Sequence, residues 1–292
     1  MSADLSTEQI QSILQGITIP PQPQVMVDLQ MEQLNPSCDI REISRLISQD
    51  VGLSGSILKT VNSPHFKHTN TITSINQAVN LLGVNSVVNL VNAHSIRGAL
   101  TDDDIIALGR FWDNAMEIAM ASTVIAKQIG FPHHDESYTL GLFHNSGIPL
   151  LLSRFKNYLQ VQQGAYGCKH RRITDYENEM ISTNHAVVGY YIAKSWNLPA
   201  YLCEAIHEHH HVQKTFSEGE SDSRKKTLLA ILKMAEHCCA SYRVLGNQQN
   251  DIEWEKIEET VLIYCGLTAY DFENMKEQVA ELGLGNADYY TR

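Results

Sequence analysis

The chain has 292 residues, of which 43% are hydrophobic and 19% charged, a composition typical of a soluble globular protein. Its 33 acidic and 22 basic residues give a formal net charge of −11 at pH 7, which argues against bulk attraction to nucleic acid or to an anionic membrane. No apolar run approaches the roughly 20 residues that span a bilayer, and the start of the chain does not resemble a signal peptide. The six cysteines include no CxxC pair, so we interpret them as reduced thiols. We therefore expect a cytoplasmic protein without a membrane segment or a nucleic-acid partner.

Helical periodicity dominates the first hundred residues, and no stretch shows convincing strand alternation. Short amphipathic helices are predicted over 5–15, 25–34, 40–48, 51–61, 74–82 and 85–100. The run Ile19-Pro20-Pro21-Gln22-Pro23 predicts a stiff extended link, because each proline restricts the residue before it. Short helices with short connections predict a compact all-α unit over residues 1–100.

The rest of the chain is also predicted to be helical. Helices are expected over 101–129, 185–196, 227–245, 252–264 and 268–282, and another, opened by Leu198-Pro199, carries the run His207-Glu208-His209-His210-His211. Gly147 and Pro149 argue against a regular helix after His144, since proline cannot donate a backbone hydrogen bond. Residues 214–226 are predicted to be a polar loop. The basic runs 169–172 and 224–226 are interpreted as solvated loops.

Several histidines fall on apolar helical faces, where an imidazole needs a polar partner. His209 shares a face with Leu202, Ala205 and Ile206, because helical neighbours lie three, four and seven residues apart. The inward histidines are His144, His185, and His209 with its neighbour His210, and Glu236 on another helix could approach them. Histidine and carboxylate ligands suit zinc, iron, manganese or nickel. The alternative is that each histidine bonds a backbone carbonyl or a carboxylate in the core, without any metal.

Four stretches together form a recognisable pattern, namely Ile19–Pro23, Ile47–Leu53, Val61–Ser63 and Ile72–Gly83, of which the last is the longest and most specific. This pattern resembles the HDOD family, the bacterial relatives of HD-type metal-dependent phosphohydrolases. The resemblance implies a compact, multi-helix all-α fold. It further implies an N-terminal helical subdomain over residues 1–100, packed on an HD-like helical subdomain over 101–292.

The resemblance also implies where the family's metal ligands fall. His144-Asn145 matches the HD pair, and the run 141–147 looks like the motif GLLHDIG of that family. His185 to Gly189 resembles the HxxxG helix of HD-GYP relatives, and His209-His210 resembles their HH pair. Three matched positions depart from the pattern, namely Asn114 for a histidine, Asn145 for an aspartate and Glu236 for an aspartate.

These departures leave two interpretations of the function. An amide cannot carry the negative charge of the HD aspartate, so Asn145 should weaken both metal binding and the activation of water. The first interpretation is a non-catalytic bacterial signal-transduction regulator that holds one divalent transition metal or none and binds a signalling protein or a small ligand. The second is a metal-dependent phosphohydrolase with an altered ligand set, acting on a phosphoester or a cyclic dinucleotide. Asn114 and Asn145 favour the first interpretation, whereas the four retained histidines favour a surviving site.

Overall fold

The computed structural model describes ten stretches of the chain. They are residues 28–29, 31–32, 34–35, 38–48, 57, 60–61, 75–90, 109–195, 198–217 and 222–285. The described residues belong to two compact units, one up to Thr101 and one from Asp102 onwards. The helix expected over 5–15 and most of the one expected over 51–61 lie outside the described residues.

The described helices of the first unit are short and amphipathic. They are α3 (Ile40–Ser48) and α5 (Ile75–Leu82), which pack against each other, and residues 84–90 are also helical. Ile43 and Ile47 of α3 are fully buried, as the spacing of the apolar residues predicts. The backbone N–H of Arg41 donates to the Asp39 carboxylate at 2.9 Å, so Asp39 caps α3.

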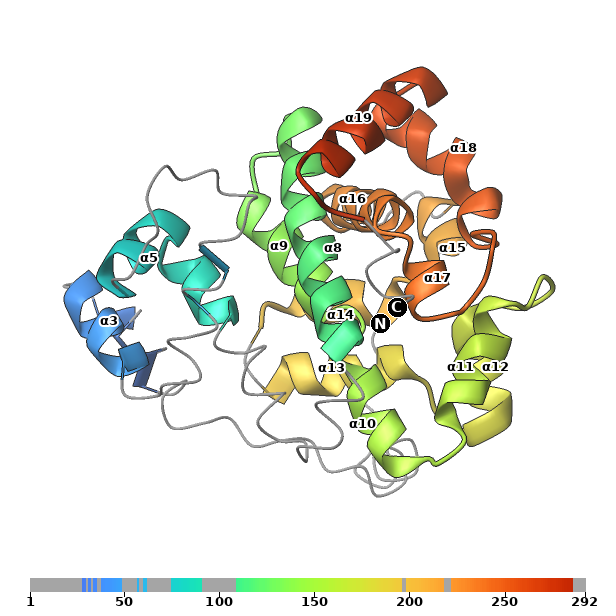
Figure 1. The fold of residues 1–292 in the computed structure, drawn as a ribbon, viewed down its shortest axis with the longest axis horizontal. Helices are drawn as coiled ribbons and strands as arrows, with labels where there is room; N and C mark the ends of the chain where they lie inside the picture. The colour runs from blue at the N-terminus through green and yellow to red at the C-terminus, as the bar shows by residue number, and fades with distance from the viewer. Residues whose placement is uncertain are drawn as a thin grey trace. The chain divides into compact units, whose positions relative to one another are not determined.

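The second unit is a bundle of helices (Figure 1). Its described helices are α8 (Gly109–Gln128), α9 (His134–Phe143), α10 (Gly147–Arg154), α11 (Tyr158–Tyr166), α12 (Ile173–Ile181), α13 (His185–Ser195), α14 (Ala200–Glu208), α15 (Val212–Ser217), α16 (Ser223–Cys238), α17 (Ser241–Val244), α18 (Trp254–Cys265) and α19 (Ala269–Glu281). The described residues include no β-strand, which confirms the all-α fold class. None of these helices combines the length and apolarity that crossing a membrane requires.

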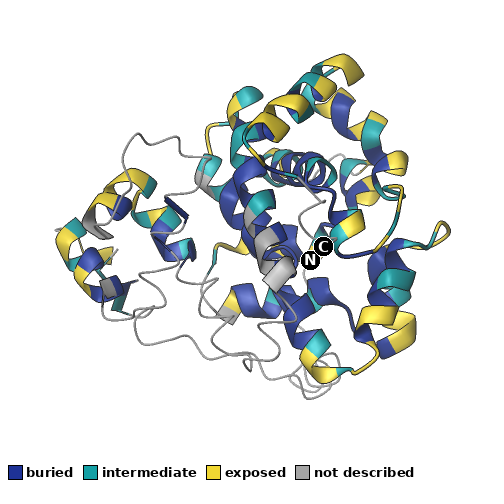
Figure 2. Cartoon of the chain, in the orientation of Figure 1, coloured by how far each residue is buried: buried dark blue, intermediate teal, exposed yellow. Residues whose placement is uncertain are grey.

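Helix α16 lies at the centre of this unit and packs against α8, α9, α14 and α18. Every residue from Leu228 to Glu236 is buried, and α16 is accordingly dark blue in Figure 2. A helix that is buried on all sides has no solvent face for its polar residues. Its two buried charged residues, Lys233 and Glu236, must therefore find partners inside the protein.

The region after His144 differs from the sequence-based expectation. The chain does break at residues 144–146, but α10 is a regular helix that contains Pro149. Pro149 is its third residue, and the first N–H groups of a helix have no intrahelical acceptor to lose. The proline is therefore accommodated, and the expectation of an irregular segment there was wrong.

Two other boundaries also differ. The helix expected over 227–245 ends at Cys238, because Ala240 has the left-handed φ of +50° and interrupts it before α17. The loop expected over 214–226 is partly helical, since α15 reaches Ser217 and α16 begins at Ser223. The basic run 224–226 consequently lies in the first turn of α16.

Candidate metal centre

The four predicted histidines lie at the ends of helices, within the buried part of the second unit. His144 is in the three-residue turn between α9 and α10, and His185 is the first residue of α13. His209 and His210 lie in the turn after α14, so the helix expected to carry the run 207–211 ends at Glu208, within that run. His144, His185 and His209 have no exposed surface, and His210 is 3% exposed. All four are therefore held away from water.

Three of these histidines meet at one point. The Nε2 atom of His185 lies 3.2 Å from that of His209 and 3.1 Å from that of His210. Their ligand atoms all lie within 4.8 Å of one another. The ring of His144 stands edge-on to that of His209, with 5.3 Å between the ring centroids. The structure thus brings together three of the predicted ligands and places the fourth histidine beside them.

The Nδ1 atom of each of these three histidines already forms a hydrogen bond. His185 Nδ1 lies 2.7 Å from the Glu177 carboxylate, His209 Nδ1 lies 2.6 Å from the Ile206 carbonyl, and His210 Nδ1 lies 2.8 Å from the Glu253 carboxylate. These oxygens are acceptors, so we assign the ring proton to Nδ1. A neutral ring in this tautomer presents only a lone pair at Nε2.

The cluster consequently fits a cation. Burial, followed by the neighbouring cationic groups, lowers the pKa of His209 and of His210 well below its ordinary value. Both rings are then neutral, and in the assigned tautomer their Nε2 lone pairs face the Nε2 atom of His185 at 3.2 and 3.1 Å. Imidazoles that offer Nε2 and donate Nδ1–H to a carboxylate or carbonyl are typical of metal sites. The donor set of His185, His209 and His210 therefore fits one transition-metal ion.

His144 and Glu236 form a second pair beside the three-histidine cluster. The Nε2 atom of His144 lies 3.3 Å from a Glu236 carboxylate oxygen, while its Nδ1 donates to the Gly141 carbonyl at 2.8 Å. Lys233 Nζ lies 2.8 Å from the other Glu236 oxygen and 2.9 Å from Glu253. Burial alone would raise the pKa of the Glu236 carboxyl, but Lys233 and His144 outweigh it and lower this pKa to about 2. Glu236 is thus an ionised carboxylate that already faces an internal cation.

The two asparagines at altered ligand positions differ in their hydrogen bonding. Asn114 on α8 donates its side-chain amide to the Cys239 carbonyl at 3.3 Å, which ties α8 to the end of α16. Asn145 is 2% exposed, and neither atom of its amide finds a hydrogen-bond partner among the described residues. Buried polar atoms are nearly always satisfied, so the Asn145 amide is available to a ligand or a water molecule.

Glycine 147 brings the turn that carries His144 close to α13. A Cβ atom at this position would lie 2.1 Å from the His185 carbonyl oxygen, closer than any real contact. A Cβ atom added at Gly189, one turn into α13, would lie 3.1 Å from a side-chain carbon of Ile206. The absence of side chains at these two glycines therefore allows three histidine-bearing segments to approach one another.

Sequence reasoning missed the charged residues that support the cluster. They are Glu177 on α12, Lys233 on α16, and Glu253 just before α18. One signal was present, because Ile173, Glu177 and Ile181 follow a helical spacing of four and all are buried. Tyr158 on α11 also contributes, since its hydroxyl donates to Glu177 at 2.5 Å. The ligand Nε2 atoms are thus backed by a layer of buried hydrogen bonds.

Comparison with known proteins agrees with the fold. The structure defines an all-α protein with a buried centre of converging imidazoles. The family model of the HDOD domain matches residues 19–212, more than half of the chain. The chain belongs to the HDOD family.

Three similar proteins are distant from this chain in sequence. A protein of Treponema pallidum named as uncharacterised is 30% identical over 203 residues, which are 66% of this chain but only 38% of that protein. A structure from Shewanella amazonensis, described as a candidate phosphohydrolase, is 23% identical with a TM-score of 0.65 and coverage of 93% and 94% of the two chains. A candidate signal-transduction protein from Marinobacter aquaeolei is 17% identical with a TM-score of 0.63, covering 94% of this chain and 62% of the other. At these identities the two structures show the fold alone.

Proposed function

We propose that the protein is a non-catalytic regulator of the HDOD family that holds one divalent transition metal through His185, His209 and His210. The observation that carries the proposal is the convergence of three buried Nε2 atoms, whose Nδ1 atoms are already engaged. Zinc, iron, manganese and nickel all accept such a ligand set. When bound, an ion of this kind supplies Lewis acidity at the cluster.

The carboxylates around the cluster support regulation rather than hydrolysis. Glu177 and Glu253 each accept from a histidine Nδ1, and Glu236 is paired with Lys233. The position that matches the HD aspartate carries the neutral amide of Asn145. Each described carboxylate at the cluster therefore already has a hydrogen-bond or ion-pair partner. None of them remains to act as the general base that deprotonates a water molecule. Lys233 also places a positive charge where a second metal ion would be repelled.

A metal-dependent phosphohydrolase is the second candidate, and one observation favours it. The Nε2 atom of His144 makes no hydrogen bond among the described residues and faces Glu236 at 3.3 Å. This pair could hold or move a proton beside the three histidines, or extend the ligand set towards Glu236. In this alternative the two asparagines alter the ligand set without abolishing turnover.

Metal content tests the site. Protein purified without a histidine tag should contain about one transition-metal ion per chain by mass spectrometry of the dissolved elements. The His185→Ala variant should lose this metal, because it removes the imidazole nearest to both of the others. His207→Ala is the matched control, since His207 is exposed and belongs to the same histidine run. Equal metal content in His185→Ala and in the native chain would contradict the proposal.

A hydrolysis assay distinguishes the non-catalytic regulator from the phosphohydrolase. The native chain, loaded in turn with each of the four metals, should not cleave bis(p-nitrophenyl) phosphate above the rate of free metal. Asn145→Asp restores a carboxylate beside His144, and it is the variant in which activity is expected to appear. Metal-dependent cleavage by the native chain that His144→Ala abolishes would establish the phosphohydrolase instead.

A further inference from the structure

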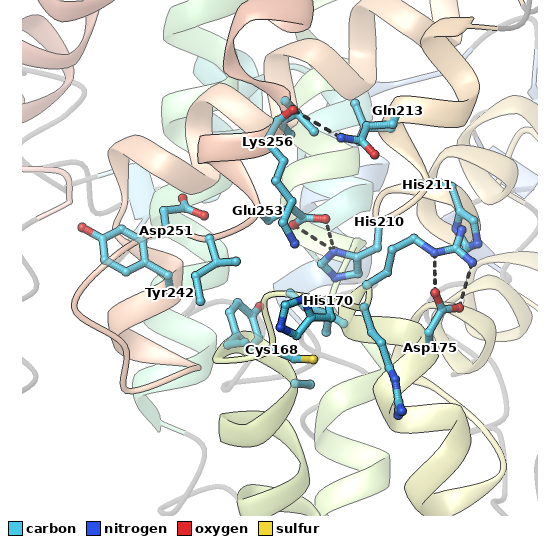
Figure 3. Close-up of a pocket in the computed structure, with 18 of the residues that line it drawn as sticks. Cys168, His170, Asp175, His210, His211, Gln213, Tyr242, Asp251, Glu253 and Lys256 are labelled. Carbon is cyan, nitrogen blue, oxygen red and sulfur yellow. Dashed lines mark hydrogen bonds and ion pairs between the residues drawn. The ribbon is translucent and has the colours of Figure 1, made fainter.

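A second candidate binding site also involves His210 but lies apart from the three-histidine cluster. It is a pocket of about 310 Å³, bordered by the connection between α11 and α12, the start of α15 and the start of α18 (Figure 3). This volume is at the lower end of the roughly 300–1,000 Å³ typical of small-molecule sites. Both partners of the His210–Glu253 hydrogen bond line the pocket, whereas neither His185 nor His209 is among the described residues that line it. The pocket is thus distinct from the point where the Nε2 atoms meet.

The pocket has a cationic rim in an acidic chain. Its cationic side chains are Arg171, Arg172, Lys214 and Lys256. Lys256 forms no ion pair with any described residue and is exposed, and in Figure 3 it stands across the pocket from Cys168 and His170. The sequence-based interpretation of run 169–172 as a solvated loop was therefore incomplete, because three of its four residues line this pocket.

The acidic residues of the pocket already form hydrogen bonds or ion pairs with other side chains. Asp175 accepts two hydrogen bonds from Arg172, at 2.7 and 2.8 Å. Asp251 lies 3.0 Å from His237 Nδ1, and Glu253 lies 2.9 Å from Lys233 Nζ. Each of these carboxylates thus has a partner other than Lys256, so the side chain of Lys256 remains available to attract an anion.

The inner wall of the pocket is aromatic and apolar. Tyr166, Tyr242 and Ile257 line it, and Tyr166 is 9% exposed. The Tyr166 hydroxyl is buried and has no hydrogen-bond partner among the described residues. Buried hydroxyl groups normally find a partner, so this hydroxyl is a polar group still to be satisfied beside the apolar wall. The wall therefore suits a ring or another apolar body with a polar edge.

We propose that this pocket binds a small organic anion, with its charged group at Lys256 and its apolar or aromatic body against Tyr166 and Tyr242. Phosphate and carboxylate share the required chemistry, because both are anions that accept hydrogen bonds from lysine and arginine. The inference deepens the proposed regulatory function by naming its ligand class, but binding at the pocket does not require a metal. The ligand would contact Glu253 and therefore reach the residue that orients His210.

Direct binding to the full chain tests the inference. Phenyl phosphate and benzoate are the two anionic probes, one for each charged group, and benzyl alcohol is the neutral probe with the same ring. Binding is measured by ligand-observed nuclear magnetic resonance, with the chain treated with a chelator and with the chain loaded with zinc. At least one anion should bind several-fold more tightly than benzyl alcohol in both preparations. Equal affinity of all three probes would overturn the inference.

Two lysine variants test whether the anion binds in this pocket. Lys256→Met should weaken binding of the preferred anion by roughly threefold to tenfold, as expected for the loss of a partly exposed charge contact, and leave benzyl alcohol unchanged. Lys276→Met on α19 is the control, since this lysine is not among the described residues that line the pocket. Equal weakening in both variants would show non-specific attraction and reject the pocket. Loss of metal from the His185→Ala variant reports on the metal centre alone, so failure of one proposal is distinguishable from failure of the other.

Discussion

Lys233 is the residue that most changes the interpretation of the site. It is 3% exposed on the central helix, and its ammonium group lies between the carboxylates of Glu236 and Glu253. Burial would lower the pKa of Lys233, but the two glutamates outweigh this and raise it. The residue is therefore a permanent internal cation, and it neutralises the carboxylate that sequence comparison places at a ligand position.

Removing this cation should destabilise the fold. Lys233→Met leaves two buried carboxylates without their shared partner, and breaking a buried ion pair typically costs about 3–5 kcal/mol. We expect a loss of this size in the free energy of unfolding, measured by urea denaturation. Lys276→Met is the control, because this lysine pairs with Glu273 at the surface and should cost less than about 1 kcal/mol. A similar cost for both variants would mean that Lys233 is not the stabilising partner of the two glutamates.

Glu177 should set the metal affinity through His185. Its carboxylate accepts from both the backbone N–H and the Nδ1 atom of His185, and Tyr158 fixes it from α11. Replacing such a partner of a ligand histidine typically lowers metal affinity by roughly 10- to 100-fold. We expect this loss for Glu177→Gln in a competition titration with a coloured chelator. Glu179→Gln, which changes an exposed residue two positions further along α12, should leave the affinity unchanged.

At the scale of the helices, the contact between α10 and α13 positions two histidine-bearing segments. Gly147→Ala would place a Cβ atom 2.1 Å from the His185 carbonyl, so the two helices must move apart. Overpacking of this kind typically costs about 1–3 kcal/mol. We expect that loss of stability together with lower metal content, measured on the same preparation.

Gly164→Ala is the matched control for this prediction. Its Cβ atom would meet the Tyr176 hydroxyl at 2.6 Å, but that group is the end of a side chain that can move, and Gly164 lies within a helix. Because alanine favours helix over glycine, the net change in stability should be small. If Gly147→Ala kept its full metal content, the contact with α13 would not control the position of His185.

Helices with conventional boundary signals could be predicted from the sequence, and those without them could not. Helices α13 and α19 begin where Asn184 and Thr268 provide caps, and Asn184 accepts from the Val187 N–H at 2.9 Å. In contrast, α12 ends at Ser182 with φ of +57°, and α16 ends next to Ala240 with φ of +50°. Glycine usually occupies such left-handed positions, so serine and alanine carried no signal of a helix end.

At the scale of the whole molecule, the resemblance to the HDOD family predicted the fold class and the segments that carry the histidines. Which groups hold these histidines could not be predicted, because the partners come from distant parts of the chain. Glu253, for example, meets His210 only after the helices have packed. Periodicity shows which face of a helix is buried, but it does not show which buried faces meet. The boundary between domains at residue 100 stays a prediction.

Metal binding should stabilise the second unit as a whole. The cluster joins segments that flank α12, α13 and α14, so an ion bound there favours the folded state. At a free metal concentration about 100 times Kd, the gain is about 2.7 kcal/mol, which corresponds to roughly 5–11 °C in Tm for a unit of this size. Calorimetry with and without a chelator measures the shift. The His185→Ala variant should show no shift, and an equal shift in that variant would place the ion elsewhere.

The position of Glu253 connects the two sites energetically. Its carboxylate holds His210 at 2.8 Å and also lines the pocket at the cationic rim. An anion that alters this hydrogen bond would change the affinity for metal, and thermodynamic linkage requires the metal to change the affinity for the anion by the same factor. Neither site would then be the sole input. The occupancy of each site would depend on the ligand bound at the other.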